Sequence, residues 1–284
     1  MPCSRCIVWR APIRKDTDMK TKKRALLAAA VLPLLFAALP SGAQTTDAAK
    51  ARPTVVLVHG AFADSSSWDG VTARLQADGY RVIGVANPLR SVKGDAAAVA
   101  SVLKSVAGPV VLVGHSYGGS VISAAANGNA NVRSLVYVAA FAPDAGESAF
   151  SLSGKFPGST LGPTLDKPVA LADGGADLYI QQAKFPEQFA ADVPRPKAVL
   201  MAAAQRPVTD AALKEASGAP AWKSVPSWFI YGKMDKNIPA AVHAFMAERA
   251  QSRHTVAVDG ASHVVMISHP DKVARIIEEA ATSK

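Results

Sequence analysis

Gly114, Ser116 and Gly118 form a G-x-S-x-G pattern within the stretch GHSYGG. An apolar run at 109–113 precedes it and an Ala-rich run follows, so the pattern predicts a strand, a sharp turn and a helix. Such a turn strains the serine backbone and requires small neighbours, because larger side chains would collide with the adjoining strand and helix. It also lifts the hydroxyl clear of the sheet edge. We therefore interpret Ser116 as a nucleophile.

A serine hydroxyl is a poor nucleophile without a base, so a histidine and an orienting carboxylate should follow it in the order Ser, acid, His. His263 lies in the loop VDGASH after the last predicted strand, at the edge where active sites of open α/β sheets gather. We predict that His263 is the general base. The alternative is a loop histidine without a catalytic role. The other histidines lie where a strand, turn, helix or cap is predicted: His59, His115, His243, His254 and His269.

Asp235 is the predicted acid. It closes the segment SWFIYGKMD, which reads as a strand followed by a turn at the same sheet edge. Its role would be to hold His263 in the correct tautomer and to stabilise the imidazolium. The alternative is an aspartate that caps the next helix. Asp144, after the fourth predicted strand, is the second candidate, and Asp259 is expected to point elsewhere.

Two backbone N–H groups are expected to bind an oxyanion. Tyr117 N–H lies at a helix N-terminus, where partial positive charge favours an anion. The second donor should come from the loop after the first strand, HGAF, with Ala61 N–H as the first choice and Phe62 N–H as the second.

These residues need a sheet to position them, and the chain alternates between strand and helix patterns. Together the patterns predict an α/β fold: a doubly wound, mostly parallel sheet of about six strands. The predicted strands are 54–58, 80–85, 109–113, 132–140, 227–231 and 254–258, and the predicted helices are 68–78, 96–106, 117–126, 239–250 and 270–281.

The alternation divides the chain into a core, 53–142 and 226–284, and an insertion after the fourth predicted strand, 143–225. The insertion contains no clean strand pattern, so we predict a mostly helical cap. Its apolar residues either line an acyl pocket or form the core of the cap, and the sequence favours neither. They are Phe150, Phe156, Leu178, Tyr179, Phe185 and Phe189.

The N-terminal region reads as a targeting segment. Residues 19–43 combine a basic start, a short apolar stretch and small residues before a cleavage site near Ala43, which is typical of a secretory signal peptide. An uncleaved anchor is the alternative. We expect an exported, periplasmic or secreted protein whose signal peptide starts at Met19, with 1–18 as a non-translated or extra N-terminal extension and 44–52 as a linker. Both cysteines, Cys3 and Cys6, lie in that extension.

Composition and charge limit the classes of molecule that this protein is expected to bind. Hydrophobic residues make up 49% of the 284 residues, which excludes a disordered chain. The formal net charge of +9 falls to about +3 without 1–43, with 23 basic against 20 acidic residues remaining. Without a basic patch interleaved with aromatic residues, nucleic-acid binding is not indicated, and no stable membrane anchoring is expected. No dinucleotide motif or metal-ligand spacing is found, so we predict no cofactor and no metal.

Four segments, HGAF, GHSYGG, YGKMDKNIP and ASHVVMISHP, together resemble the α/β-hydrolase superfamily from Arg52 to the end of the chain. More narrowly, their spacing resembles the branch of plant methylesterases and hydroxynitrile lyases and its bacterial relatives. The resemblance implies a cofactor-free site under a cap, with Ser116, Asp235 and His263 as a triad and the Ala61 and Tyr117 amides as the oxyanion hole. A homodimer would suit this family.

Within that branch, lyases tend to carry a threonine after the first-strand His or Ile and a lysine after the catalytic histidine. Here those positions are Gly60 and Val264, which favours a serine carboxylesterase of small esters. The alternatives are a hydroxynitrile lyase or other C–C cleaving enzyme, a cofactor-free haloperoxidase or perhydrolase, and a ligand-binding receptor. The expected substrate contacts are Phe62, Tyr117, Phe150 and Val264.

Overall fold

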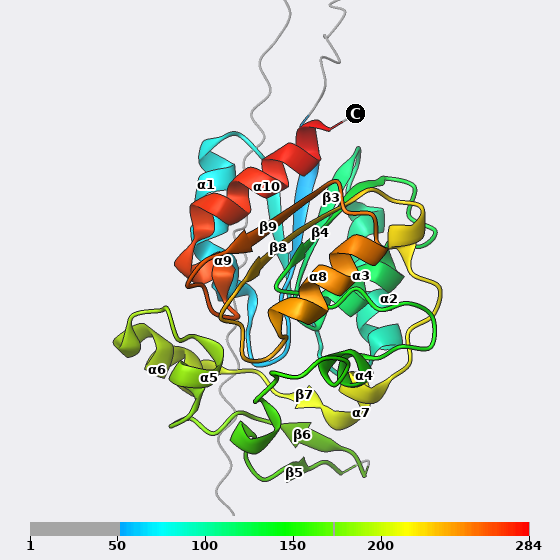
Figure 1. Ribbon diagram of the computed structural model, residues 1–284. Helices are drawn as coiled ribbons and strands as arrows, with labels where there is room; N and C mark the ends of the chain where they lie inside the picture. The colour runs from blue at the N-terminus through cyan, green and yellow to red at the C-terminus, as the bar shows by residue number, and fades with distance from the viewer. Residues whose placement is uncertain (1–51, 173, 284) are drawn as a thin grey trace, which may run out of the picture. The chain divides into compact units, whose positions relative to one another are not determined.

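The computed structural model describes residues 52–172 and 174–283 (Figure 1). The predicted extension at 1–18, the predicted signal peptide at 19–43 and all but the last residue of the predicted linker at 44–52 lie outside the described residues. Within the described part, no helix is both long and apolar enough to cross a membrane.

Six strands form one sheet in the order β2-β1-β3-β4-β8-β9, and every neighbouring pair is parallel. Both β1 and β3 are fully buried, as expected of apolar strands covered on both faces. The predicted α/β-hydrolase fold is confirmed. The strands are β1 (Thr54–Val58), β2 (Val82–Val85), β3 (Val110–His115), β4 (Val132–Val138), β8 (Ser227–Gly232) and β9 (His254–Val258).

Helices cover both faces of this sheet (Figure 1). On one face, α1 (Asp69–Ala77) packs against α10 (Pro270–Thr282), while α2 (Val92–Ser105), α3 (Gly118–Ala125) and α8 (Ala240–Arg249) lie on the other. Two short helices, η1 (Ser65–Trp68) and α9 (Val265–Ser268), complete the core. The loops that follow β1, β3, β8 and β9 therefore meet at the carboxyl edge of the sheet.

The inserted segment covers that edge, and most of its regular structure is helical, as predicted. It contains a three-stranded antiparallel sheet beside its helices. The strands have only two or three residues, too few to produce an alternating pattern in the sequence. Its elements are α4 (Ala149–Ser153), η2 (Gly162–Thr164), β5 (Val169–Ala170), β6 (Ala176–Leu178), α5 (Phe185–Phe189), α6 (Arg195–Ala204), β7 (Val208–Thr209), α7 (Asp210–Lys214) and η3 (Ala221–Lys223).

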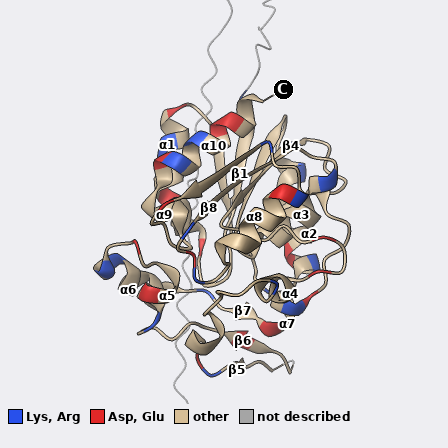
Figure 2. Ribbon diagram, in the orientation of Figure 1, with Lys and Arg blue, Asp and Glu red and all other residues tan. Residues whose placement is uncertain are grey.

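Basic and acidic residues are interspersed over the described part of the chain, and α1 and α10 carry both signs (Figure 2). Some of them pair directly: Arg74 of α1 with Asp271 of α10, and Lys214 with Asp210 at 2.8 Å within α7. Exposed pairs of this kind contribute little to stability.

A substitution just after β3 tests the packing described for this fold. A Cβ on Gly119 would lie 2.1 Å from the carbonyl oxygen of Phe141, so Gly119→Ala must move backbone. We expect it to lower the free energy of unfolding by about 1–3 kcal/mol, measured by urea denaturation. Gly218→Ala is the matched control, because a Cβ there meets nothing within 4 Å. Equal stabilities of the two variants would contradict the packing described.

Candidate active site

Ser116 occupies the turn between β3 and α3 in a strained conformation. Its φ of 53° lies in the left-handed region, which is rare for a residue with a side chain. Backbone bonds hold it there: Ser116 N–H donates to Val138 O at 3.3 Å, and its carbonyl accepts from Phe141 N–H at 3.1 Å. Glycines give the room, since a Cβ on Gly118 would lie 2.7 Å from Val58 O. The strained turn predicted from GHSYGG is thus present.

His263 lies in the loop after β9, with 1% of its surface exposed. Its Nδ1 donates to Asp235 Oδ2 at 2.7 Å. Its ring packs against Phe189, with centroids 5.0 Å apart, and against His115, with centroids 4.8 Å apart. With the proton on Nδ1, the neutral ring carries its lone pair on Nε2.

Asp235 follows β8, and its carboxylate is fully buried. Oδ1 accepts the backbone N–H groups of Asn237 at 2.8 Å and Ile238 at 2.9 Å, while Oδ2 accepts from His263 and from His243. Burial by itself raises the pKa of this carboxyl, but the charge and hydrogen bonds of the two histidines lower it more. The net pKa lies well below the ordinary value.

His243 is a partner of Asp235 that the sequence analysis missed. The helix predicted for it is present as α8, but its Nε2 lies 3.2 Å from Asp235 Oδ2 in the buried interior. The ring stacks on Tyr231, with centroids 4.7 Å apart. Burial lowers the pKa of His243, so the ring is neutral and Nε2–H donates. Its place eight residues after Asp235 does not by itself indicate this contact.

A small pocket of about 40 Å³ brings Ser116 and His263 together. Its wall is mainly apolar and, among the described residues, includes no Lys, Arg, Asp or Glu. Of the expected substrate contacts, Phe62, Tyr117 and Phe150 line it. Val264 is not part of the wall, because it is fully buried in the core. The lining residues are Ala61, Phe62, Ser116, Tyr117, Phe141, Ala149, Phe150, Ser153, Leu161, Phe189, Leu213, Asn237, Ile238 and His263.

Two backbone donors face no acceptor at this pocket. Within the described part of the chain, the N–H groups of Ala61 and Tyr117 make no hydrogen bond, and both residues line the pocket with Ser116. The second choice from the sequence, Phe62 N–H, donates instead to Arg206 O at 3.0 Å. The hydroxyl of Tyr117 is also engaged, with Asp95 Oδ2 at 2.9 Å.

The alternative acids lie elsewhere. Asp144 pairs with Lys223 at 2.5 Å, and Asp259 pairs with Lys233 at 2.7 Å. Neither aspartate lines the pocket. Asp235 is therefore the candidate acid that the fold brings to His263.

The apolar cap residues divide between the two roles left open by the sequence. Phe150, which is 64% exposed, and the buried Phe189 line the pocket. The others lie outside the lining: Phe185 packs on Phe189 with centroids 4.8 Å apart, and Phe156 packs on Phe245 at 5.8 Å. Leu178 is buried within the cap.

In residues 52–172 and 174–283, no group of three or more His, Cys, Asp or Glu is placed to hold a metal ion. The pocket itself presents a serine, an oriented imidazole and two free amides.

The profile of the Alpha/beta hydrolase family matches residues 55–276. The chain belongs to this family. It is 36% identical over 111 residues to a carbendazim hydrolyzing esterase of Nocardioides sp. (strain SG-4G), covering 34% of this chain and 46% of that protein.

Two solved structures share the fold of this chain. Polyneuridine aldehyde esterase superposes with a TM-score of 0.69 at 19% identity, covering 81% of this chain and 99% of its own. The Arabidopsis methylesterase MES16 superposes with a TM-score of 0.67 at 18% identity, with the same coverage.

Buried histidines predict a pH dependence of stability. Burial lowers the pKa of His59, His115 and His243 below that of the unfolded chain. As the pH falls below about 6.5, these histidines bind protons in the unfolded state but stay neutral in the folded state. We expect the free energy of unfolding to fall by up to about 1.4 kcal/mol per pH unit for each histidine that stays neutral.

Urea denaturation between pH 7 and pH 5 measures this slope. The variant His243→Leu should show a shallower slope than the parent, because one of the three rings with a lowered pKa is gone. Stability that is constant or rises as the pH falls over this range would contradict the assignment of neutral buried rings.

Proposed function

We propose that this protein is a serine carboxylesterase that hydrolyses small, neutral carboxylic esters through an acyl-enzyme. The observation that carries the proposal is the pocket in which strained Ser116 and Asp235-bound His263 meet, beside the free amides of Ala61 and Tyr117. Membership of the Alpha/beta hydrolase family and local identity to an esterase support it.

In the first half-reaction, Ser116 Oγ attacks the ester carbonyl carbon while His263 Nε2 takes the hydroxyl proton. Asp235 keeps the proton of His263 on Nδ1 and stabilises the imidazolium that forms. The amides of Ala61 and Tyr117 donate to the carbonyl oxygen as it becomes negative. The C–O bond then breaks, and His263 returns the proton to the departing alcohol.

In the second half-reaction, a water molecule takes the place of the alcohol. His263 Nε2 accepts its proton as the oxygen attacks the acyl carbon. The tetrahedral intermediate collapses, the bond to Ser116 Oγ breaks, and His263 gives the proton back to the serine. The products are a carboxylic acid and the free enzyme.

The size and wall of the pocket support small, neutral substrates. It holds about 40 Å³, and no charged Lys, Arg, Asp or Glu among the described residues lines it. Burying a charged substrate group there without a partner would be costly. Phe62, Phe150 and Phe189 offer apolar surface instead.

The geometry disfavours the lyase alternative. A Cβ on Gly60 would lie 2.6 Å from Ser116 Cβ, so this loop has no room for the threonine that lyases tend to carry. Val264 is fully buried, so no side chain at that position faces the pocket in the place of the lyase lysine.

Hydrolysis of p-nitrophenyl esters from acetate to palmitate tests the proposal. We expect turnover of the short-chain members only, because the pocket is small. Ser116→Ala should lower kcat by about 10⁶-fold, since the nucleophile is lost. Short-chain turnover that survives in Ser116→Ala would contradict the proposal.

The two histidines on Asp235 should contribute unequally. Asp235→Asn should lower kcat by about 10⁴-fold, because His263 would then adopt the wrong tautomer. His243→Leu removes one of four hydrogen bonds to the carboxylate and should lower kcat by about 10-fold. Steady-state kinetics on p-nitrophenyl acetate gives both numbers, and equal losses in the two variants would show that His243 is as essential as Asp235.

A further inference from the structure

Asn237 brings a polar group to a mainly apolar pocket. Among the described residues that line the pocket, it contributes the only side-chain amide. The other polar lining residue outside the proposed triad and oxyanion hole, Ser153, already donates its hydroxyl to Ala149 O at 2.9 Å.

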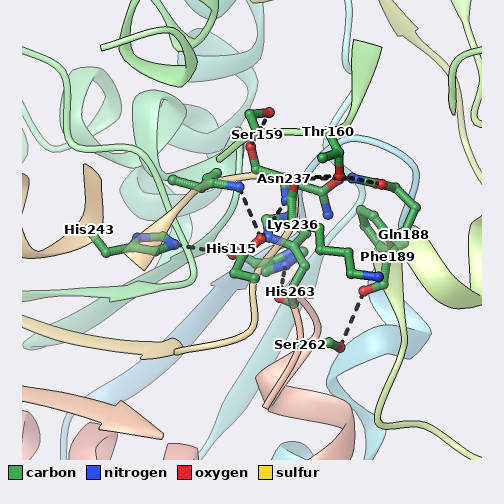
Figure 3. Close-up of polar contacts among 12 residues, drawn as sticks. His115, Ser159, Thr160, Gln188, Phe189, Lys236, Asn237, His243, Ser262 and His263 are labelled. Atoms are coloured by element: carbon green, nitrogen blue, oxygen red, sulfur yellow. Dashed lines mark hydrogen bonds and ion pairs between the residues drawn. The ribbon is translucent and has the colours of Figure 1, made fainter. Parts of the chain in front are cut away.

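Hydrogen bonds fix the orientation of the Asn237 amide (Figure 3). Gln188 Nε2 donates to Lys236 O at 3.0 Å, which determines which end of the Gln188 amide is nitrogen. The same Nε2 donates to Asn237 Oδ1 at 2.9 Å, and Gln188 Oε1 accepts from Thr160 Oγ1 at 2.9 Å. A flipped Asn237 would set its NH₂ against the NH₂ of Gln188. Nδ2 is therefore the end of Asn237 that faces away from Gln188.

Nδ2 has no acceptor among the described residues, and it is buried. Asn237 as a whole is 4% exposed. Buried donors without a partner are rare in folded proteins, and each one calls for an explanation. The residue is also held firmly, because its backbone N–H donates to Asp235 and its carbonyl accepts from Ser159 Oγ at 2.9 Å. Asn237 lines the pocket, and a fixed donor without a partner on such a residue is suited to binding an acceptor on a ligand.

We propose that Asn237 Nδ2 donates a hydrogen bond to an acceptor oxygen of the bound ester other than its reacting group. The preferred substrates are then small, neutral esters that carry an ether or carbonyl oxygen, rather than hydrocarbon esters of the same shape. This inference rests on the proposed esterase function. A site built to hydrogen-bond a substrate group rejects the analogue that lacks it, because the site's own polar group is left unpaired.

Two pairs of isosteric esters test the preference. On the alcohol side the pair is 2-methoxyethyl acetate and butyl acetate, and on the acyl side it is p-nitrophenyl methoxyacetate and p-nitrophenyl butyrate. In each pair one CH₂ is replaced by an ether oxygen. The quantity measured is the ratio of kcat/KM within a pair, compared between the parent protein and Asn237→Leu. Intrinsic reactivity differences between the two esters cancel in that comparison.

We expect Asn237→Leu to lower the ether-to-hydrocarbon ratio by about 5- to 10-fold for at least one pair. Asn237→Ala should lower it similarly, and it serves as a second variant if the leucine variant does not fold. Ser153→Ala is the matched control, and its ratios should stay at the parent value because its hydroxyl is already paired. Ratios unchanged in both Asn237 variants, with ester turnover intact, would overturn the inference and leave the esterase function standing.

Binding measured without turnover distinguishes a failure of the esterase proposal from a failure of the proposed role of Asn237. In Ser116→Ala, isothermal calorimetry should show tighter binding of 2-methoxyethyl acetate or methyl methoxyacetate than of butyl acetate or methyl butyrate, respectively. Adding Asn237→Leu should remove that difference. If the parent hydrolyses no ester but the difference is present and is lost with Asn237→Leu, the donor role stands and the esterase function fails. If Ser116→Ala binds both members of each pair equally, the inference is overturned.

Discussion

The buried carboxylate of Asp235 is the constraint on which the site depends. A charge removed from water is tolerated only when it is paired and hydrogen-bonded, and four donors satisfy this one. They come from the loop after β8, from α8 and from the loop after β9. Because β8 and β9 are neighbouring parallel strands, the loops that follow them lie side by side at the carboxyl edge of the sheet. His263 is thereby fixed within the same pocket as Ser116.

The cap contributes to the same arrangement. Gln188 and Thr160 bond the backbone and side chains of the loop at 236–237, and Ser262 donates to Asp192 in the cap. The cap thus covers the pocket and also holds the loops that carry the acid and the base. A substitution in α5 can therefore alter catalysis without touching the substrate.

Much of the core could be predicted from the sequence, because buried parallel strands are continuous apolar runs with clear ends. β1 and β9 have the predicted bounds, and the strained serine turn was evident from its glycines. The roles of His243 and Asn237 could not be predicted, since each depends on which way a side chain turns once α8 and α5 have packed. The short strands of the cap gave no periodic signal, and the buried position of Val264 reflects packing of the segment that starts α9.

Reaction with a phosphonate ester, followed by peptide mapping with mass spectrometry, tests the central claim most directly, because the reagent captures only an activated nucleophile. Our account predicts a single adduct on the peptide that contains Ser116, formed rapidly in the parent and much more slowly in His263→Ala. An adduct at another serine, or equal labelling rates in the parent and His263→Ala, would contradict it.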